Sequence, residues 1–222
     1  MQAATCERLV KIVILGAGGH GREALDTIRA ALAAAAEPDE VLGFLDDQEV
    51  SLETIGRLGL PYLGPVVALK DLDARFVIGI GLPRTRRRVD ELAMSWEKAT
   101  RSIVHPSATI GTDVVVGEGA LIAAGARVST HCWIGRQVYI GPNVTVGHDC
   151  VLENYATLLP GANVSGNVRL GAETLIGAGA TIRQGVAIGD AATVGMGAAV
   201  LNDVDAASVV VGVPARVQRR DG

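Results

Sequence analysis

A six-residue hydrophobic period runs without a break through the second half of the chain. From Val104 to Val200, every sixth residue is Ile, Leu or Val, and the residue two positions before each one from Ile110 onward is Ala, Val, Cys or Thr. A hexapeptide repeat of this kind predicts a parallel β-helix. If three hexads close one triangular coil, residues eighteen apart become neighbours. A β-sandwich is the alternative, but sandwiches do not keep a strict six-residue phase over so long a segment.

The positions within a hexad have different expected roles. The aliphatic residue and the small residue point inward and fill a narrow shaft, while the coils stack at a strand spacing of about 4.8 Å. Nine of the seventeen aliphatic residues are followed directly by Gly, which we expect at tight corners because it lacks a Cβ. The pattern does not determine the handedness of the coil.

Before about residue 104 the hydrophobic pattern changes. Short apolar strands alternate with helices, which predicts a small parallel α/β sheet. We therefore expect a Rossmann-like α/β domain over residues 1–103 and a β-helix over 104–222. Gly212–Arg216 depart from the period and are expected to cap the open end of the β-helix. The expected strands and helices of the first domain are Val10–Leu15, Gly19–Ala36, Val41–Asp46, Pro61–Gly64, Phe76–Ile80 and Thr85–Ala99.

Composition narrows the functional classes. The 222 residues are 49% hydrophobic but only 3% aromatic, and the net charge of −4 gives no global signal for nucleic acid or an anionic membrane. No apolar run approaches the length of a membrane span, and the N-terminal apolar stretch contains Lys11 and is expected to form a strand rather than a signal peptide. Cys132 and Cys150, eighteen apart, are expected to stack as buried thiols in a reducing cytoplasm.

A glycine-rich loop lies between the first expected strand and the first expected helix. Gly16, Gly18 and Gly21 satisfy G-x-G-x-x-G, and in this context backbone N–H groups and the helix dipole can hold a diphosphate. Asp46 ends the second expected strand, with Asp47 beside it, and such an acid could contact a ribose, a base edge or a sugar. A packing turn without a ligand is the alternative.

An arginine cluster could screen phosphates or form a solvated helix face; its members are Arg84, Arg86, Arg87 and Arg88.

His148 is the candidate general base. It follows Val146-Gly147 and so lies at a corner, where a neutral imidazole can accept a proton near pH 7 from a substrate outside the prism. Asp149 could fix its tautomer, although adjacent residues point in different directions, so that Asp149 could instead serve another subunit's site or need a bent backbone. Gly166, eighteen residues on, would stack under the histidine with its N–H open to a carbonyl oxygen. An ordinary surface histidine is the alternative.

Taken together, these features resemble the bacterial nucleotide-sugar N-acetyltransferases related to the sialic acid O-acetyltransferases. The resemblance covers essentially the whole length. It implies a left-handed β-helix assembled as a homotrimer, with acetyl-CoA in the groove between neighbouring β-helices. Besides the hexads, it rests on Ile14–Gly21, Phe44–Asp47, Ile80-Gly81 with Arg86 following, Val104–Pro106, Gly147–Asp149 and Gly212–Ala215.

The resemblance also implies residue roles. His148 matches the catalytic base and Gly166 the residue whose N–H contacts the acetyl carbonyl, while the N-terminal domain would bind the nucleotide of a sugar substrate and not NAD. Asp149 stands where Glu is commoner, and Thr157 where relatives often carry a second active-site His. Expected contacts to acetyl-CoA are Gly166, Gly177, Gly179 and Gly195. Expected contacts to the nucleotide sugar are Gly16, Gly18, Gly19, His20, Gly21, Asp46, Asp47 and Arg86.

The implied function is acetyl transfer from acetyl-CoA to the C4 amine of a UDP- or GDP-linked 4-amino-4,6-dideoxyhexose, in polysaccharide or O-antigen biosynthesis. The amine would attack the thioester directly, without an acyl-enzyme and without a metal. O-acetylation of sialic acid or another sugar uses the same fold and base and stays open, as does, more remotely, an NAD-binding or non-catalytic β-helix protein. The sequence leaves the nucleotide and the hexose undetermined.

Overall fold

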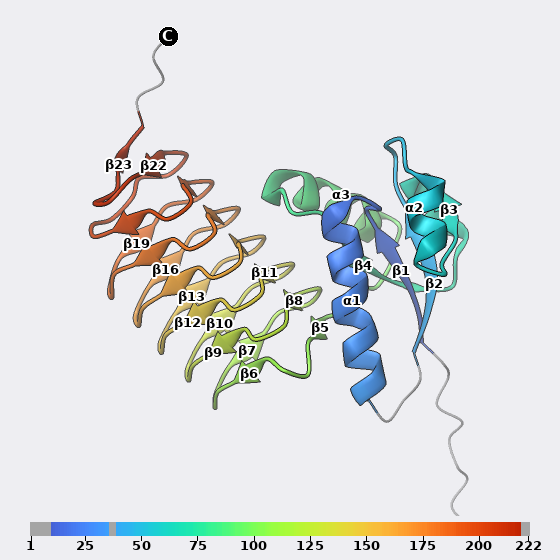
Figure 1. Ribbon diagram of the computed structural model, residues 1–222, viewed down its shortest axis with the longest axis horizontal. Coiled ribbons are helices and arrows are strands. Elements are labelled where there is room, and N and C mark those ends of the chain that lie inside the picture. The colour runs from blue at the N-terminus through green and yellow to red at the C-terminus, as the bar shows by residue number, and fades with distance from the viewer. Residues whose placement is uncertain (1–9, 36–38, 219–222) are drawn as a thin grey trace, which may run out of the picture.

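The computed structural model describes residues 10–35 and 39–218. Ala36, the expected end of the first helix, and the outermost residues of both expected domains lie outside this part of the chain. The described residues form an α/β unit beside a stack of triangular coils, as the sequence predicts (Figure 1).

The α/β unit is built on a four-stranded parallel sheet with strand order β3-β2-β1-β4. The central strand β1 is almost completely buried, because helices cover both faces of the sheet. The short helix α2 and the 3-10 helix η1 are additions to the expected elements, and Ser51 caps α2 by accepting a hydrogen bond from the backbone N–H of Thr54 at 3.2 Å. The bounds are β1 Lys11–Leu15, α1 Gly19–Ala34, β2 Glu40–Leu45, α2 Leu52–Arg57, β3 Tyr62–Gly64, η1 Val66–Asp71, β4 Arg75–Ile78 and α3 Pro83–Ser95.

The coils form a parallel β-helix with three sheets. Up to Val200, strands pair in parallel at a register of eighteen residues, so that Ile134 lies between Val116 and Leu152, whereas Thr193 pairs with Val209 at a register of sixteen. The domain-facing sheet, covered by the α/β unit, contains β5 Ile103–Val104, β8 Leu121–Ile122, β11 Tyr139–Ile140, β14 Thr157–Leu158, β17 Leu175–Ile176, β20 Thr193–Val194, β22 Val209–Val211 and β23 Arg216–Val217. The groove sheet contains β6 Thr109–Ile110, β9 Arg127–Val128, β12 Thr145–Val146, β15 Asn163–Val164, β18 Thr181–Ile182 and β21 Ala199–Val200. The third sheet contains β7 Val115–Val116, β10 Trp133–Ile134, β13 Val151–Leu152, β16 Arg169–Leu170 and β19 Ala187–Ile188.

The shaft of the β-helix is filled as the hexad pattern predicts. The aliphatic and the small positions of adjacent coils form one continuous buried cluster. Cys132 and Cys150 belong to it with exposed fractions of 2% and 0%, and both are free thiols. At the far end, β22 and β23 pair antiparallel, and Ala215 between them packs against the last layer of the shaft.

The corners of the coils depend on a left-handed residue three positions after each aliphatic residue from Ile110 to Val194. Asp149 is one example, with φ of 57°, and Tyr155 in the next hexad has φ of 63°. The Gly directly after the aliphatic residue was expected to permit a tight corner, but the structure gives another reason for it. A Cβ on Gly147 would lie 2.5 Å from the backbone nitrogen of Gly166 in the next coil. This Gly therefore permits the close approach of adjacent coils, whereas the turn itself falls two residues later.

The three corners of the prism carry different side chains. The His148 corner, between the groove sheet and the third sheet, has Asp113, His131, Asp149 and Asn167 at its left-handed positions. The α3 corner, between the third sheet and the domain-facing sheet, has Gln137, Tyr155 and Glu173. The glycine corner, between the domain-facing sheet and the groove sheet, has Asn143, Gly161, Gly179 and Gly197.

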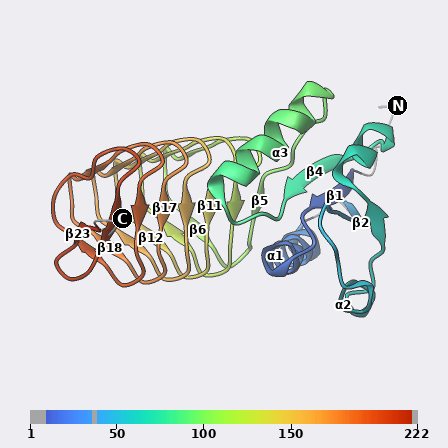
Figure 2. The same cartoon turned by 90° about the horizontal axis from the view of Figure 1, so that it is seen from above.

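Helix α3 joins the α/β unit to the β-helix at the α3 corner (Figure 2). Asp90 on α3 is fully buried and accepts hydrogen bonds from Arg136, Gln137 and the hydroxyl of Tyr155. Helix α1 packs nearby, and its residues share one apolar cluster with Leu121 of the domain-facing sheet. The α/β unit is thus held at two places and has a fixed position relative to the coils.

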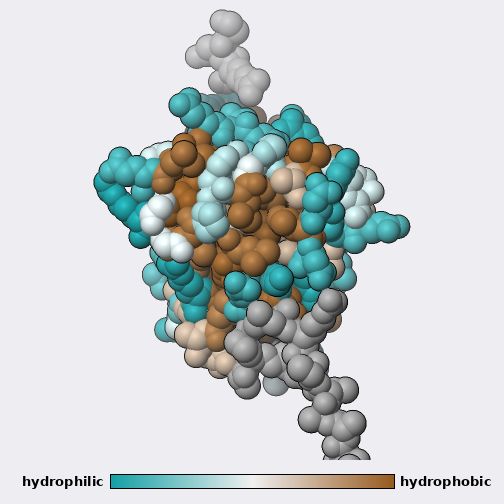
Figure 3. Space-filling view, turned by 90° about the vertical axis from the view of Figure 1, so that its right-hand side faces the viewer, coloured by the Kyte–Doolittle hydropathy of each residue, from teal (hydrophilic) through white to brown (hydrophobic). Residues whose placement is uncertain are grey.

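The face of the α/β unit that points away from the β-helix carries apolar surface ringed by polar side chains (Figure 3). The most exposed large apolar side chains of this unit are Leu52, Val67 and Leu82, at 65%, 50% and 64%. Within residues 10–35 and 39–218, no helix is both long enough and apolar enough to cross a bilayer.

Candidate active site

His148 and Asp149 form a hydrogen-bonded pair at the turn between β12 and β13. The imidazole Nδ1 of His148 lies 2.6 Å from Oδ2 of Asp149. Adjacent side chains diverge in an extended strand, but the left-handed backbone of Asp149 brings its carboxylate beside the imidazole. An ionised carboxylate can only accept, so Nδ1 carries the proton and Nε2 is left as an acceptor. Both side chains are about half exposed, at 49% and 47%.

Gly166 lies directly under the imidazole, as the eighteen-residue spacing predicts. A Cβ at this position would lie 2.6 Å from Nε2 of His148 and 2.7 Å from Cε1. Only glycine therefore permits this imidazole position. The N–H of Gly166 has no hydrogen-bond partner among the described residues, so a basic nitrogen and a free N–H donor lie at one place on the surface.

A second histidine adjoins this pair. His131, one coil earlier, lies with Nδ1 3.6 Å from Oδ1 of Asp149 and with Nε2 3.2 Å from Oδ2 of Asp113. Our sequence reasoning did not assign a role to His131. The signal was present in the numbering, because 113, 131 and 149 are eighteen apart. No group of three or more His, Cys, Asp or Glu side chains in the described part of the chain is arranged to hold a metal.

The glycine-rich loop borders a pocket of about 290 Å³ at the carboxyl ends of the parallel strands, where open α/β sheets bind ligands. Gly16 has φ of +106°, and a Cβ on Gly21 would lie 2.0 Å from the carbonyl oxygen of Gly16. These two glycines are required by the tight turn itself. A Cβ on Gly18 would meet nothing within 4 Å, and one on Gly19 would meet only Arg22 at 3.8 Å, so the loop is open toward a ligand there.

The two aspartates shape this pocket through backbone contacts. Asp46 accepts hydrogen bonds from the N–H of Ala17 at 2.7 Å and the N–H of Gln48 at 2.9 Å. Asp47 accepts from the N–H of Val66 at 2.8 Å through one oxygen only. Both carboxylates line the pocket. Asp47 therefore has an oxygen available to a ligand donor, whereas Asp46 mainly fixes the glycine-rich loop.

His20 closes the inner side of the pocket. Its ring meets Tyr139 of the β-helix edge to face, with centroids 4.4 Å apart. Burial, together with the nearby Arg86 charge, lowers the pKa of His20 to about 4. Its buried Nε2 has no hydrogen-bond partner in the described structure. His20 is therefore neutral at physiological pH and joins the pocket to the first coils.

Arg86 does not lie where a substrate contact was expected. It is 2% exposed and donates hydrogen bonds to the carbonyl oxygens of Gln137 at 2.9 Å and Tyr155 at 2.7 Å, and to the hydroxyl of Thr157 at 2.6 Å. Burial lowers its pKa to about 10, so the guanidinium stays charged at neutral pH. Arg86 is thus an anchor between the two units, and Thr157 is one of its buried partners. The cation that lines the pocket is Arg88.

The candidate residues lie on different faces of one chain. The glycine-rich pocket belongs to the unit that covers the domain-facing sheet, whereas the His148 corner joins the other two sheets. Gly177, Gly179 and Gly195 lie at the glycine corner, across the groove sheet from His148. A groove of about 430 Å³ lies on the groove sheet, lined by residues that include Thr145, Gly147, Asn163 and Ser165. One chain by itself does not bring the expected nucleotide contacts to His148.

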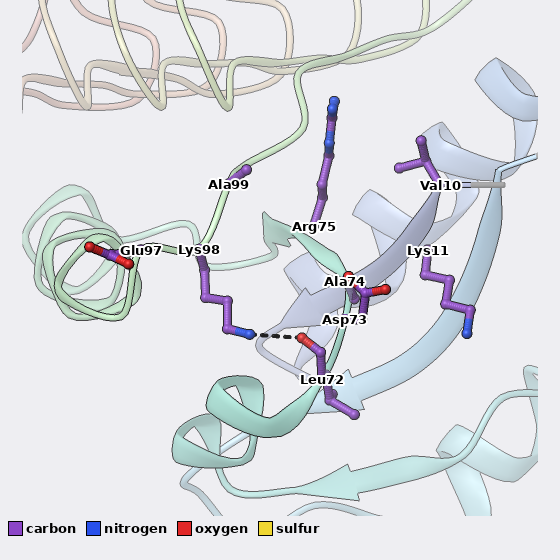
Figure 4. Close-up of a pocket in the computed structure, with 9 residues that line it drawn as sticks. All are labelled: Val10, Lys11, Leu72, Asp73, Ala74, Arg75, Glu97, Lys98 and Ala99. Atoms are coloured by element: carbon purple, nitrogen blue, oxygen red, sulfur yellow. Dashed lines mark hydrogen bonds between the residues drawn. The ribbon is translucent and has the colours of Figure 1, made fainter. Parts of the chain in front are cut away.

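A further cavity is separate from all of these residues. It has a volume of about 650 Å³ and lies at the amino ends of β1 and β4, opposite the glycine-rich loop (Figure 4). Lys98 crosses one side of it and donates to the carbonyl oxygen of Leu72 at 2.8 Å. Its position at the wrong end of the parallel sheet excludes it as the site formed by the glycine-rich loop.

A hexapeptide β-helix with a histidine–carboxylate pair over a glycine, joined to an α/β unit with a glycine-rich pocket, defines the class of hexapeptide-repeat acyltransferases. Residues 11–92 match the PglD N-terminal domain family, and residues 119–220 match the GMPPB C-terminal domain family. The UDP-N-acetylbacillosamine N-acetyltransferase of Bacillus subtilis (strain 168) is 30% identical over 118 residues, which cover 51% of this chain and 51% of that protein. The chain spans about half the length of the curated relatives it matches.

Several solved structures match over nearly the whole length of the chain. PerB from Caulobacter crescentus, in complex with CoA and GDP-perosamine, is 30% identical with a TM-score of 0.86, covering 96% of this chain and 99% of that one. The acetyltransferase domain of PglB from Neisseria gonorrhoeae FA1090, in complex with acetyl coenzyme A, is 32% identical with a TM-score of 0.82, covering 95% and 100%. The chain belongs to the bacterial nucleotide-sugar N-acetyltransferases related to the sialic acid O-acetyltransferases, and its β-helix is left-handed.

Proposed function

We propose that the protein transfers the acetyl group of acetyl-CoA to the C4 amine of a nucleotide-linked 4-amino-4,6-dideoxyhexose. The observation that carries this proposal is the imidazole of His148, held by Asp149 at 2.6 Å and placed over Gly166. The relatives support the substrates. PerB was solved with CoA and GDP-perosamine, and the Bacillus subtilis relative is a UDP-N-acetylbacillosamine N-acetyltransferase.

In the proposed reaction, the amine attacks the thioester carbonyl directly. Nε2 of His148 accepts the proton that the amine loses as the new C–N bond forms. Asp149 holds the tautomer and stabilises the imidazolium. The imidazolium then returns the proton to the departing CoA thiolate. Because the amine attacks the thioester directly, no acyl-enzyme forms. Burial raises the pKa of the Cys150 thiol to about 11, which opposes its use as a nucleophile.

The developing oxyanion is stabilised by the N–H of Gly166. This N–H is free of partners in the described structure and lies beside the imidazole. A preorganised donor of this kind acts where charge develops, because it needs no reorganisation during the reaction. The base then accepts the proton of the attacking amine while the donor, from the adjacent coil, binds the oxygen of the carbonyl group under attack.

The nucleotide sugar is proposed to bind in the pocket of the α/β unit. The free N–H groups at the start of α1, near Gly18 and Gly19, would hold the diphosphate. Arg88 supplies positive charge at the same pocket. The free oxygen of Asp47 can accept from a nucleobase or sugar donor. Asp47 is compatible with UDP and with GDP, since both bases present N–H donors.

We further propose that the active protein is a homotrimer. Within one chain the nucleotide pocket and His148 lie on different faces of the prism, and the glycine corner is separated from His148 by the groove sheet. A neighbouring copy can bring its own pocket and glycine corner to this His148. Acetyl-CoA then lies between two β-helices, with the contacts from Gly177, Gly179 and Gly195 supplied by one copy.

The test is release of CoA from acetyl-CoA by the purified protein with UDP- and GDP-linked 4-amino-4,6-dideoxyhexoses, beside the corresponding free sugars. Turnover that requires both the nucleotide and the 4-amino group supports the proposal. Equal turnover with a free sugar would remove the nucleotide role of the α/β unit. A matched thermal-shift experiment with each nucleotide sugar measures binding without turnover, because a ligand of the native state raises its stability.

A further inference from the structure

The two buried thiols of the shaft lie against the backbone of the His148 corner. Sγ of Cys132 is 3.1 Å from the carbonyl oxygen of Gly147, and Sγ of Cys150 is 3.2 Å from the carbonyl oxygen of Ser165. Each thiol thus contacts the coil that follows its own. The first contact reaches the peptide group that precedes His148, and the second reaches the peptide group that precedes Gly166.

These carbonyls, like those of Gly111 and Ser129 at the same corner, lack the hydrogen bond that most other turns of the β-helix have. At the glycine corner, for example, the N–H of Ala162 donates to the carbonyl oxygen of Leu159 at 3.1 Å, and the N–H of Ala180 to that of Gly177 at 3.1 Å. Among the described residues, no backbone N–H donates to the carbonyl oxygen of Gly147 or Ser165. The thiols are the donors that reach these two carbonyl oxygens, which lie closer to Sγ than the alternative acceptors, the carbonyl oxygens of Thr130 at 3.5 Å and His148 at 3.6 Å.

The direction of the carbonyl determines the direction of the next N–H. A trans peptide group is planar, and its C=O and N–H point in opposite directions. The carbonyl of Ser165 points toward Cys150 in the shaft. The N–H of Gly166 therefore points away from the shaft, toward the surface where the imidazole of His148 lies.

We propose that Cys150 is a positioning residue, whose S–H···O=C contact with Ser165 holds the N–H of Gly166 in the direction needed to stabilise the oxyanion. Cys132 holds the peptide group before His148 in the same way. The inference rests on the proposed acetyl transfer, because the role of the Gly166 N–H belongs to that reaction. It gives a structural role to two thiols that take no part in the proposed reaction.

The chemistry of the site suits this role. Burial is the main cause that raises the pKa of the Cys150 thiol, which therefore keeps its proton and can donate at neutral pH. The position tolerates other small side chains, since Val168 and Val186 occupy it in the next two coils. Valine preserves the packing but cannot donate, whereas serine can donate but leaves part of the volume empty. Valine and serine variants at position 150 therefore separate the effect of the hydrogen bond from the effect of the packing.

The experiment compares Cys150→Val with Cys150→Ser in the full-length protein, with Val168→Ala as the packing control in the same column. Steady-state CoA release should give a kcat roughly two- to fivefold lower for Cys150→Val, with both KM values unchanged. Cys150→Ser should restore kcat, and Val168→Ala should leave it at the wild-type level. If Cys150→Val does not fold, Cys150→Ala replaces it, because alanine occurs at this position in many hexads.

A second readout does not depend on turnover. The amide ¹H–¹⁵N signal of Gly166 should shift in Cys150→Val and return toward the wild-type position in Cys150→Ser. An unmoved signal in Cys150→Val, or equal losses of kcat in the valine and serine variants, would overturn the inference. If the wild-type protein does not acetylate any of the nucleotide amino sugars, the proposed function fails, and the amide signal still decides whether Cys150 orients the peptide group.

Discussion

Nδ1 of His148 lies 2.6 Å from Oδ2 of Asp149, although the two residues are adjacent in sequence. In an extended strand, adjacent side chains point to opposite sides and could not meet in this way. Asp149 has a left-handed backbone with φ of 57°, which turns its carboxylate toward the imidazole. The pair is therefore a product of the coil geometry. Each corner of this β-helix has a left-handed residue, and here that residue carries a carboxylate beside a histidine.

Replacement of Asp149 by Asn should lower kcat by roughly 10- to 100-fold. The amide can present either its NH2 group or its oxygen to Nδ1, so it no longer selects the tautomer in which Nε2 accepts a proton. The backbone should be unaffected, because Asn143 and Asn167 already occupy the equivalent left-handed position. Steady-state kinetics measure the effect, and circular dichroism checks the fold. Wild-type kcat in this variant would mean that Asp149 does not set the tautomer.

Replacement of His148 by Ala should lower kcat by about 10²- to 10⁴-fold through the loss of the general base. Because the side chain is 49% exposed, the thermal unfolding midpoint should change little. His105→Ala is the matched control, since His105 also lies at a coil corner but contacts only Ser107 among its side-chain partners. Equal activity in the His148 and His105 variants would contradict the assignment of the base.

Replacement of Gly166 by Ala should lower kcat strongly and the thermal unfolding midpoint only slightly. The added Cβ would lie 2.6 Å from Nε2 of His148, so the imidazole must leave its position over the peptide group. Gly56→Ala is the control, because a Cβ at Gly56 would meet nothing within 4 Å. Kinetics and thermal unfolding are measured on both variants. A Gly166→Ala enzyme with wild-type kcat would show that the imidazole does not act from this position.

The buried His20 predicts an acid-dependent loss of stability. Burial is the main cause that lowers its pKa from 6.5 to about 4 in the folded state. The folded protein therefore favours the neutral ring. The free energy of unfolding therefore does not change with the titration of His20 above pH 6.5. It falls as the pH decreases from 6.5 to about 4, because the unfolded chain binds a proton at His20 that the folded protein does not. The total loss from this one group is about 3 kcal/mol at most.

Urea unfolding of the wild type and of His20→Gln across this pH range measures the effect. The wild type should lose stability more steeply than the variant between pH 6.5 and 4, because glutamine does not titrate. Parallel curves for the two proteins would show that His20 is not held neutral in the folded state.

Replacement of Arg86 by Lys should destabilise the protein by about 2–4 kcal/mol. An ammonium group cannot replace the fork of N–H donors that reaches Gln137, Tyr155 and Thr157, and some of these buried acceptors would lose their partner. Chemical unfolding measures the loss. Arg87→Lys is the control, because Arg87 forms exposed ion pairs, and its unfolding midpoint should match the wild type. Equal midpoints for the two variants would show that the anchor is not needed.

The β-helix could be predicted from the sequence because its period is carried by every hexad. The neighbours of Ile134, the stacking of Cys132 on Cys150 and the place of Gly166 under His148 all follow from a spacing of eighteen. These relations depend only on backbone repetition. For the same reason they needed no knowledge of side-chain contacts.

The side-chain contacts could not be predicted in the same way. Arg86 and Arg88 stand two residues apart in one cluster, and only the docking of α3 on the coils decides that Arg86 is buried and that Arg88 lines the pocket. The contact of His148 with Asp149 depends on a dihedral angle that no hydrophobic pattern reports. The separation of His148 from the glycine-rich pocket depends on how the α/β unit docks on the coils, which no period in the sequence encodes.

The eighteen-residue register also limits how this sequence can change in length. Removal of a whole coil beyond Gly185 would shorten the prism and leave every remaining residue on its original face. Removal of a single hexad before His148 would instead turn all later residues by one third of a revolution and carry the histidine to another edge. Within the regular coils, only the removal or insertion of three hexads therefore keeps every later strand in its own sheet, and with it the rotational position of the α3 corner relative to the His148 corner.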